Sequence, residues 1–215
     1  MPTPIENCTA VILAGGENKR MPVLKSFIDI NGETIIHRQL AVLRTLFHDI
    51  MIITNDPCHY MYLKIPLYGD VYPIRGPLTG IVTALLNSRT EWIFVAACDM
   101  PFLDEKIISY MASQRNDWDC VIPLNGEQLE PLMAFYSQRI AYKAEKALLR
   151  EQRKIQILLS NSKVRYINDS EIKSLCPHER TFINLNTPDD LRLCEEITQR
   201  EISYKGVRVK RGDSL

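Results

Sequence analysis

The chain has 215 residues, 46% of them hydrophobic, and its 26 basic residues balance its 26 acidic residues. We expect a globular protein with a full core, organised as a single domain over residues 1–202 with a basic tail over 203–215. The neutral balance argues against nucleic acid and anionic membrane surfaces as partners. No apolar run approaches the length of about 18 residues needed to span a membrane, and the start MPTPIENCTA is unlike a signal peptide.

Short apolar runs alternate with amphipathic stretches. In chain order, the pattern first predicts a strand over residues 9–15, a helix over 34–47, a strand over 49–55, a helix over 77–88 and a strand over 91–99. It then predicts a helix over 103–113, strands over 119–124 and 132–137, and helices over 138–152 and 154–161. The last predicted elements are strands over 164–168 and 181–185 and a helix over 187–199. Asp104 and Thr187 are the expected N-caps. The alternation predicts a three-layer α/β fold with a mostly parallel sheet. Such sheets bind ligands beyond the carboxyl ends of their strands.

The first predicted strand ends in Ala14-Gly15-Gly16, and the cations Arg20 and Lys25 follow. Glycine lets several backbone N–H groups point at one anion, so the loop could hold a polyphosphate with the help of the two cations. A plain glycine turn with solvated cations is the alternative. The chain contains neither GxxxxGK[ST] nor GxGxxG, which excludes a P-loop and a dinucleotide fingerprint.

The strand expected over 91–99 ends in AACDMPF. Asp99 should emerge at the carboxyl edge of the sheet, where a carboxylate that faces a phosphate loop suits Mg²⁺. Alone, Asp99 could equally be a turn-forming residue before Pro101. Together with the glycine loop it indicates a site for a Mg-nucleotide.

Two further segments are candidates for the rim of the site. In YPIRGPLTGI, Gly76, Pro77 and Gly80 predict a rigid turn into a helix, which either lines a pocket or simply connects two elements. In FINLNTPDD, Asn184 and Asn186 alternate on the expected strand and could face a ligand together, although helix entry alone would explain the segment.

The six cysteines show no CxxC spacing, and several stand in apolar runs. This usage predicts buried, reduced thiols in a cytoplasmic protein. Cys58 and His59 are adjacent, but two ligands do not make a zinc site.

These motifs together resemble a known family. LAGGENKRMPVLK resembles the LAGGxSxRMGxDK signature of the molybdenum cofactor guanylyltransferases, the MobA group of nucleotidyltransferases, and RGPLTGI, ACDMPF and INLNTPDDL match later motifs of that group in order. The resemblance covers about residues 9 to 200. It implies a Rossmann-like nucleotidyltransferase fold whose N-terminal half binds the nucleotide and whose C-terminal half binds the pterin.

The resemblance also implies a reaction, in which the terminal phosphate of molybdopterin attacks the α-phosphorus of GTP and pyrophosphate leaves. Molybdenum-insertion proteins and acceptor molybdoenzymes are implied as further partners. In the implied site, Leu13, Ala14, Gly15 and Gly16 contact the nucleotide through their backbone, and Lys25 and Arg20 bind its phosphates. Asn55 and Asp70 are the implied side chains that contact the nucleotide, and Asp99 is the implied Mg²⁺ ligand. Asn184 and Asn186 are implied to face the second substrate or the metal.

The chain departs from the signature at two positions, with Pro22 in place of glycine and Leu24 in place of aspartate. Proline removes one N–H donor from the loop. We therefore expect the combined change Pro22→Gly and Leu24→Asp to raise the affinity for GTP. Two alternatives stay open: a related enzyme that uses CTP on molybdopterin or another phosphorylated acceptor, and a non-catalytic protein that binds nucleotide or pterin.

Overall fold

The computed structural model describes residues 3–15, 24–176 and 179–210. Its main sheet has the strand order β10-β7-β9-β6-β1-β4-β5, with β8 paired to β7. The strands of this sheet are β1 (Cys8–Leu13), β4 (Asp49–Ile53), β5 (Leu67–Tyr68), β6 (Trp92–Ala97), β7 (Cys120–Asn125), β8 (Gln128–Leu129), β9 (Met133–Ser137) and β10 (Val164–Ile167). A separate hairpin is formed by β2 (Asp29–Ile30) and β3 (Glu33–Thr34).

The sheet is mixed but mostly parallel, as predicted. Strand β1 pairs in parallel with both β4 and β6, and β4 with β5 and β7 with β10 are also parallel. Strand β9 is antiparallel to both β6 and β7. Strand β7 therefore runs in the same direction as β6, and the carboxyl ends of β1, β4, β6 and β7 lie at one edge of the sheet.

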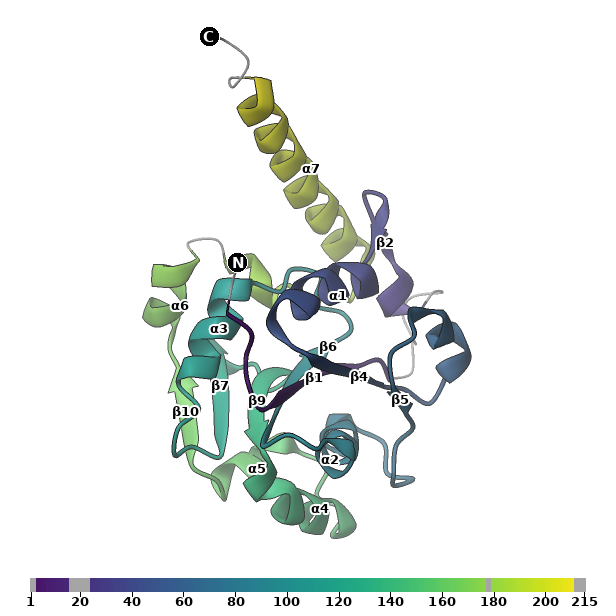
Figure 1. Cartoon of the computed structure of the whole chain (residues 1–215), viewed down its shortest axis with the longest axis vertical. Coiled ribbons are helices and arrows are strands. Elements are labelled where there is room, and N and C mark those ends of the chain that lie inside the picture. Colours follow the sequence, from purple (N-terminus) through teal and green to yellow (C-terminus); the bar gives the residue numbers. More distant parts are fainter. Residues whose placement is uncertain (1–2, 16–23, 177–178, 211–215) are drawn as a thin grey trace.

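Helices cover both faces of the sheet, which confirms the predicted three layers (Figure 1). On one face lie α1 (Ile35–Leu46), α3 (Glu105–Ser113) and α6 (Asp169–Leu175), and on the other lie α2 (Pro77–Asn87), α4 (Ala141–Leu149) and α5 (Ile155–Ser160). The described 3₁₀ helices are η1 (Lys25–Phe27), η2 (Pro57–His59), η3 (Met61–Leu63), η4 (Gln138–Ile140) and η5 (Glu179–Phe182).

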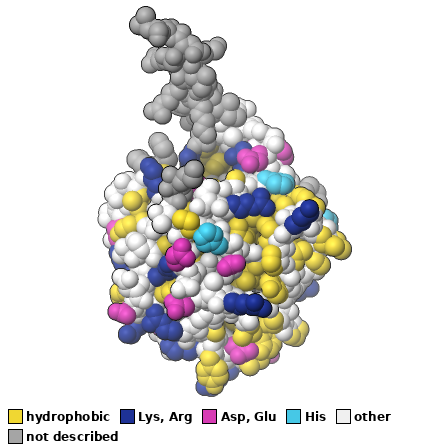
Figure 2. Space-filling view, in the orientation of Figure 1, with side chains coloured by type: hydrophobic (Ala, Val, Ile, Leu, Met, Phe, Trp, Pro, Cys, Tyr) yellow, Lys and Arg dark blue, Asp and Glu magenta, His cyan; other side chains and the backbone are white. Residues whose placement is uncertain are grey.

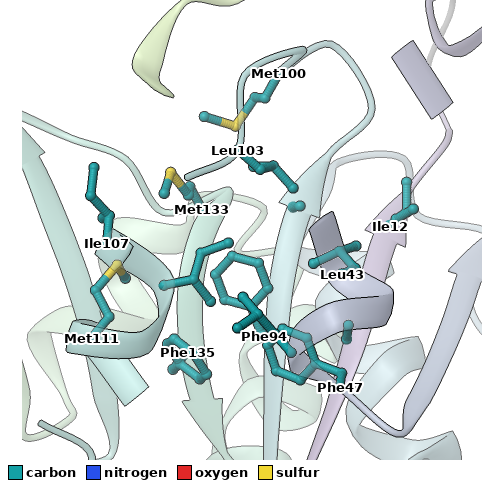
Figure 3. Close-up of a cluster of buried hydrophobic side chains, with 14 of the residues drawn as sticks. Ile12, Leu43, Phe47, Phe94, Met100, Leu103, Ile107, Met111, Met133 and Phe135 are labelled. Atoms are coloured by element: carbon teal, nitrogen blue, oxygen red, sulfur yellow. The ribbon is translucent and has the colours of Figure 1, made fainter. Parts of the chain in front are cut away.

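Alternate residues of the central strands feed two cores. On β1, Ile12 packs toward α1 and α3, whereas Val11 packs toward α2 on the other face. Figure 3 shows the first core, in which the rings of Phe94 and Phe135 have centroids 4.8 Å apart and Phe47 stacks on Phe94 at 5.6 Å. Each fully buried side chain of this kind stabilises the fold by about 1.5–3 kcal/mol. The two cores fix the sheet, and with it the edge where the strands end.

The strand predicted over residues 181–185 is wrong. The structure places η5 at its start, and Leu185 makes a single backbone bond, from its N–H to the carbonyl of Asp99 (2.8 Å), instead of a strand ladder. Phe182 and Leu185 are buried, at 6% and 0% exposure. The apolar pattern of this segment therefore indicates burial in the core and not strand pairing. Helix α6 was not predicted, although Asn168 and Glu171 form a capping box at its start.

The last helix is longer than predicted. Helix α7 runs over Pro188–Lys210 and projects from the body of the protein in Figure 1. The expected tail is therefore helical over residues 203–210, and residues 211–215 lie outside the described part. Both predicted N-caps are confirmed: the Asp104 carboxylate accepts from Lys106 N (2.8 Å), and the Thr187 hydroxyl accepts from Asp190 N (3.2 Å).

Basic and acidic side chains are interspersed over the face shown in Figure 2, in keeping with their equal totals. Among the described helices, none is both long and apolar enough to cross a membrane.

Candidate functional site

A cleft of about 690 Å³ opens at the carboxyl edge of the sheet. The ends of β1, β4 and β6 form its floor, and the start of α2 forms one wall. Residues from several separate segments of the chain line it: Leu13, Ala14, Gly15, Leu24, Lys25, Ser26, Ile53, Thr54, Asn55, Tyr60, Asp70, Arg75, Gly76, Pro77, Gly80, Ala97, Cys98, Asp99 and Leu132. The cleft lies where a parallel sheet is expected to bind ligands.

The centre of the site is the ammonium group of Lys25. It lies 2.9 Å from Asp99 Oδ2 and 2.6 Å from Asn186 Oδ1, and it donates a hydrogen bond to each. Lys25 comes from η1, Asp99 from the turn after β6 and Asn186 from the segment before α7, so three distant parts of the chain meet here. The side chains of Lys25 and Asp99 are 22% and 21% exposed. Both groups are therefore fixed by partners while remaining open to a ligand.

A buried polar contact holds the segment that carries Lys25. The hydroxyl of Ser26, the next residue, is 2.9 Å from the hydroxyl of Tyr60, and the ring of Phe27 packs 5.1 Å from that of Tyr60. Burial raises the pKa of the neighbouring Cys98 thiol to about 11, so this thiol is neutral near pH 7.

A second polar pair lies on the β4–β5 side of the cleft. Asn55 Nδ2 donates to Asp70 Oδ2 (2.8 Å), and Asp70 N donates back to Asn55 Oδ1 (2.9 Å). The amide side chain thus fixes the position of the carboxylate. Asn55 is exposed and Asp70 is partly exposed, which leaves the carboxylate of Asp70 accessible to donors on a ligand.

Close packing shapes the wall between β1 and α2. A Cβ atom placed on Gly80 would lie 3.0 Å from Leu13 Cδ2, tighter than an ordinary contact. The absence of a side chain at Gly80 therefore lets helix α2 approach the strand end.

The structure brings together most of the residues singled out in the sequence. Ten line the cleft, namely Leu13, Ala14, Gly15, Lys25, Asn55, Asp70, Gly76, Pro77, Gly80 and Asp99, and Asn186 reaches Lys25. The proposed strand alternation of Asn184 with Asn186 is wrong, and the amide of Asn184 donates to Phe182 O at 3.4 Å instead. Gly16, Arg20 and Pro22 lie outside the described residues.

Sequence reasoning missed Ser26 and Tyr60. Ser26 could have been found from its place beside Lys25, but no local signal links it to Tyr60. The weak metal candidate at Cys58 and His59 has a simple explanation, because His59 Nδ1 lies 3.0 Å from Asp56 Oδ2 and the segment is exposed. In the described part of the chain, no group of three His, Cys, Asp or Glu side chains could hold a metal ion.

The residues at the centre fit a magnesium ion bound together with phosphates. The oxygens of Asp99 and Asn186 already flank a cation, the Lys25 ammonium. Carboxylate and amide oxygens are hard donors of the kind that Mg²⁺ prefers, and Mg²⁺ usually takes only one or two carboxylates because water and phosphate complete its shell. One carboxylate at this position is therefore sufficient.

A family model described as a MobA-like NTP transferase domain matches residues 10–165. The chain belongs to the MobA-like NTP transferase family. The resemblance seen in the sequence is thereby confirmed. The chain is also similar to proteins that are named molybdenum cofactor guanylyltransferases. A probable molybdenum cofactor guanylyltransferase of Peptoclostridium acidaminophilum is 34% identical over 200 residues, 90% of each chain. A molybdenum cofactor guanylyltransferase of Desulfosudis oleivorans is 32% identical over 87% of this chain and 94% of its own.

Solved structures agree with this family assignment. Molybdopterin-guanine dinucleotide biosynthesis protein A of Archaeoglobus fulgidus superposes with a TM-score of 0.78 at 26% identity, over 89% of this chain and 99% of that one. A 4-diphosphocytidyl-2C-methyl-D-erythritol synthase of Anaerococcus prevotii superposes with a TM-score of 0.70 at 15% identity, over 91% of this chain and 98% of that one, which shows a shared fold alone.

Proposed function

We propose that this chain transfers GMP from GTP to the terminal phosphate of molybdopterin, forming a guanine dinucleotide cofactor and pyrophosphate. The observation that carries the proposal is the Lys25 ammonium, held by Asp99 and Asn186 at the carboxyl edge of a nucleotidyltransferase sheet. The names of relatives that cover most of the chain support guanylyl transfer in particular.

The nucleotide occupies the cleft over β1 and β4. Backbone groups of Leu13, Ala14, Gly15 and Gly16 contact it at the strand end, where glycine permits close approach. Asp70, oriented by Asn55, accepts hydrogen bonds from donors on the base or the ribose.

Lys25, assisted by Arg20, neutralises the phosphates. The acceptor phosphate is already ionised near pH 7, so the transfer depends on alignment and on charge stabilisation more than on a general base. On binding, the ammonium of Lys25 exchanges its contact with Asp99 for contacts with phosphate oxygens, which frees the carboxylate. Asp99, with Asn186 beside it, would then hold Mg²⁺, which when bound supplies charge neutralisation at the phosphates.

The acceptor binds to residues that follow Asp99 in the sequence. We assign Asn184 and Asn186 to this binding, because they precede α7 and Asn186 reaches Lys25. Both substrates thus bind to a single domain over residues 1–202. Its first half binds the nucleotide and its second half binds the pterin. Partners that insert molybdenum or receive the product would act before or after the transfer. A cytoplasmic location suits a GTP-dependent enzyme in which four of the six thiols are buried.

The first test is calorimetry of GTP, CTP and ATP with Mg²⁺ on the wild type and on Asp99→Ala. Selective binding of GTP that weakens in the variant supports the proposal. Equal binding of the three nucleotides, or none, contradicts it. Release of pyrophosphate in a single turnover with molybdopterin then distinguishes an enzyme from a protein that only binds nucleotide.

A further inference from the structure

A second carboxylate–asparagine pair lies on the opposite side of Asp99 from Asn55 and Asp70. Glu130 follows β8, and its carboxyl group lies near the side chain of Asn125, the last residue of β7, which lowers the pKa of Glu130 against a larger rise caused by burial. The two pairs lie at the same edge of the sheet, because β4 and β7 both run parallel to β6.

The backbone fixes the position of Glu130. Its N–H donates to Pro123 O (3.0 Å), and its carbonyl accepts from Met133 N (3.1 Å). Two residues later, the carbonyl of Leu132 accepts from Ala97 N (2.9 Å) at the end of β6, and Leu132 lines the cleft. Glu130 thus lies just beyond the cleft, on the side away from β1 and β4.

The environment of Glu130 leaves its charge poorly compensated. The residue is half-buried, and among the described residues no cation forms an ion pair with it. Burial raises the pKa of Glu130 above its ordinary value, and the negative charge of Asp99 adds to this, against the effect of the Asn125 side chain. Burying a carboxylate without enough donors costs free energy, so the group is suited to donors on a ligand.

The arrangement has an approximate symmetry about the reacting centre. Strands β4 and β7 are each two places from β6 in the sheet, so each asparagine lies roughly 10 Å to one side of the strand that carries Asp99.

A carboxylate presents two acceptor oxygens, which match a ring N–H beside an amino group. The guanine ring of GTP and the pterin ring of molybdopterin both carry such a donor–donor edge, in a 2-amino-4-oxopyrimidine.

We propose that Glu130, oriented by Asn125, binds the 2-amino-4-oxopyrimidine edge of the acceptor pterin, as the counterpart of Asp70 and Asn55 on the nucleotide side. The assignment rests on the proposed function. It places one carboxylate on each side of Lys25 and Asp99, with one for each of the two ring systems that the product contains.

The test compares Glu130→Gln with Glu127→Gln, an exposed residue of the same hairpin. Pyrophosphate release is measured at saturating GTP and constant Mg²⁺ while molybdopterin is varied. Glutamine keeps the shape of the side chain but loses the charge and one acceptor oxygen, so we expect the acceptor KM to rise about tenfold or more. The Kd for GTP stays unchanged, and the control variant behaves as the wild type. Asn125→Ala, which removes only the orienting amide, gives a smaller rise in the same acceptor KM.

Three results would overturn the assignment: an unchanged acceptor KM in Glu130→Gln, a parallel loss of GTP affinity, or a shift in Mg²⁺ activation in place of the acceptor KM. If the wild type releases no pyrophosphate with molybdopterin, the proposed function has failed, and binding of 6-hydroxymethylpterin, followed by its fluorescence, tests Glu130 separately. Binding that is lost in Glu130→Gln supports the assignment, whereas equal binding by both proteins, or none by the wild type, overturns it.

Discussion

The hydroxyl oxygens of Ser26 and Tyr60 share a buried hydrogen bond of 2.9 Å, and each side chain is only 1% exposed. Because Ser26 follows Lys25 directly, this bond ties the residue that carries the central ammonium to the segment between η2 and η3. The position of the ammonium thus depends on this anchor at the next residue as well as on the oxygens of Asp99 and Asn186.

Tyr60→Phe removes this bond with little change in volume. We expect a loss of about 1 kcal/mol in the free energy of unfolding, measured in urea. We also expect a several-fold loss of GTP affinity in calorimetry, because Lys25 is less well fixed. Tyr110→Phe is the matched control, since its hydroxyl donates to Glu171 Oε1 (2.6 Å) away from the cleft. If both variants lose stability and neither loses GTP affinity, Tyr60 has only a structural role.

Lys25→Ala separates activity from stability. The ion pair with Asp99 is partly exposed, and such pairs contribute about 0–1 kcal/mol, so the melting temperature should change little. The rate of pyrophosphate release should fall by about 100-fold or more, because a positive charge aimed at the phosphates is lost. Lys25→Arg keeps the charge but replaces a compact ammonium by a planar fork, and we expect intermediate activity. A wild-type rate in Lys25→Ala would remove this residue from the mechanism.

Gly80→Ala tests the close approach of α2 to β1. In an open helix this change stabilises by up to about 1 kcal/mol. Here the new Cβ would meet Leu13 Cδ2 at 3.0 Å, so we expect the opposite sign, with a lower melting temperature and weaker GTP binding as Leu13 is pushed toward the cleft. Shortening the neighbour in Gly80→Ala/Leu13→Val should restore part of the stability. A higher melting temperature in the single variant would show that the wall yields without strain.

The start of α7 gives a prediction for acid pH. The carboxylate of Asp190 accepts from the N–H groups of Asn186 (2.9 Å) and Thr187 (2.8 Å), and these bonds, that of Asn186 first, lower the pKa of Asp190 below its ordinary value of 3.8. Since the pKa is lower in the folded state, the stabilisation is present above pH 3.8 and is lost as the pH falls through the folded value. The difference in melting temperature between wild type and Asp190→Asn should therefore be constant near pH 7 and shrink below about pH 4. A constant difference down to pH 3 would contradict this assignment.

The sequence predicted the longer elements of the fold because they are strongly periodic, but it missed the two-residue strands β2, β3, β5 and β8. The order of the strands was less accessible, since the antiparallel insertion of β9 between β6 and β7 depends on pairing between distant segments. The false strand at 181–185 has the same origin, because apolar residues that pack singly into a core resemble those of a strand.

The site shows a similar division. Gly15, Lys25 and Asp99 could be predicted because each stands at or near a strand end or in a motif with a chemical reason. The contact between Lys25 and Asn186 could not be derived from local pattern, since the two residues are brought together only by the packing of the segment before α7. Glu130 gave no signal at all, because its significance comes from burial and from its place relative to Asp99.

The contacts of Lys25 also say when the site can form. Asp99 lies 74 positions and Asn186 161 positions after Lys25, in a chain of 215 residues. During synthesis from the N-terminus, the glycine loop and the first strands emerge long before Asn186 does. A growing chain on the ribosome therefore lacks one of the two oxygens that hold the ammonium until Asn186 has been made. Substrate can stabilise the completed protein by mass action, but it cannot guide the early assembly of the sheet.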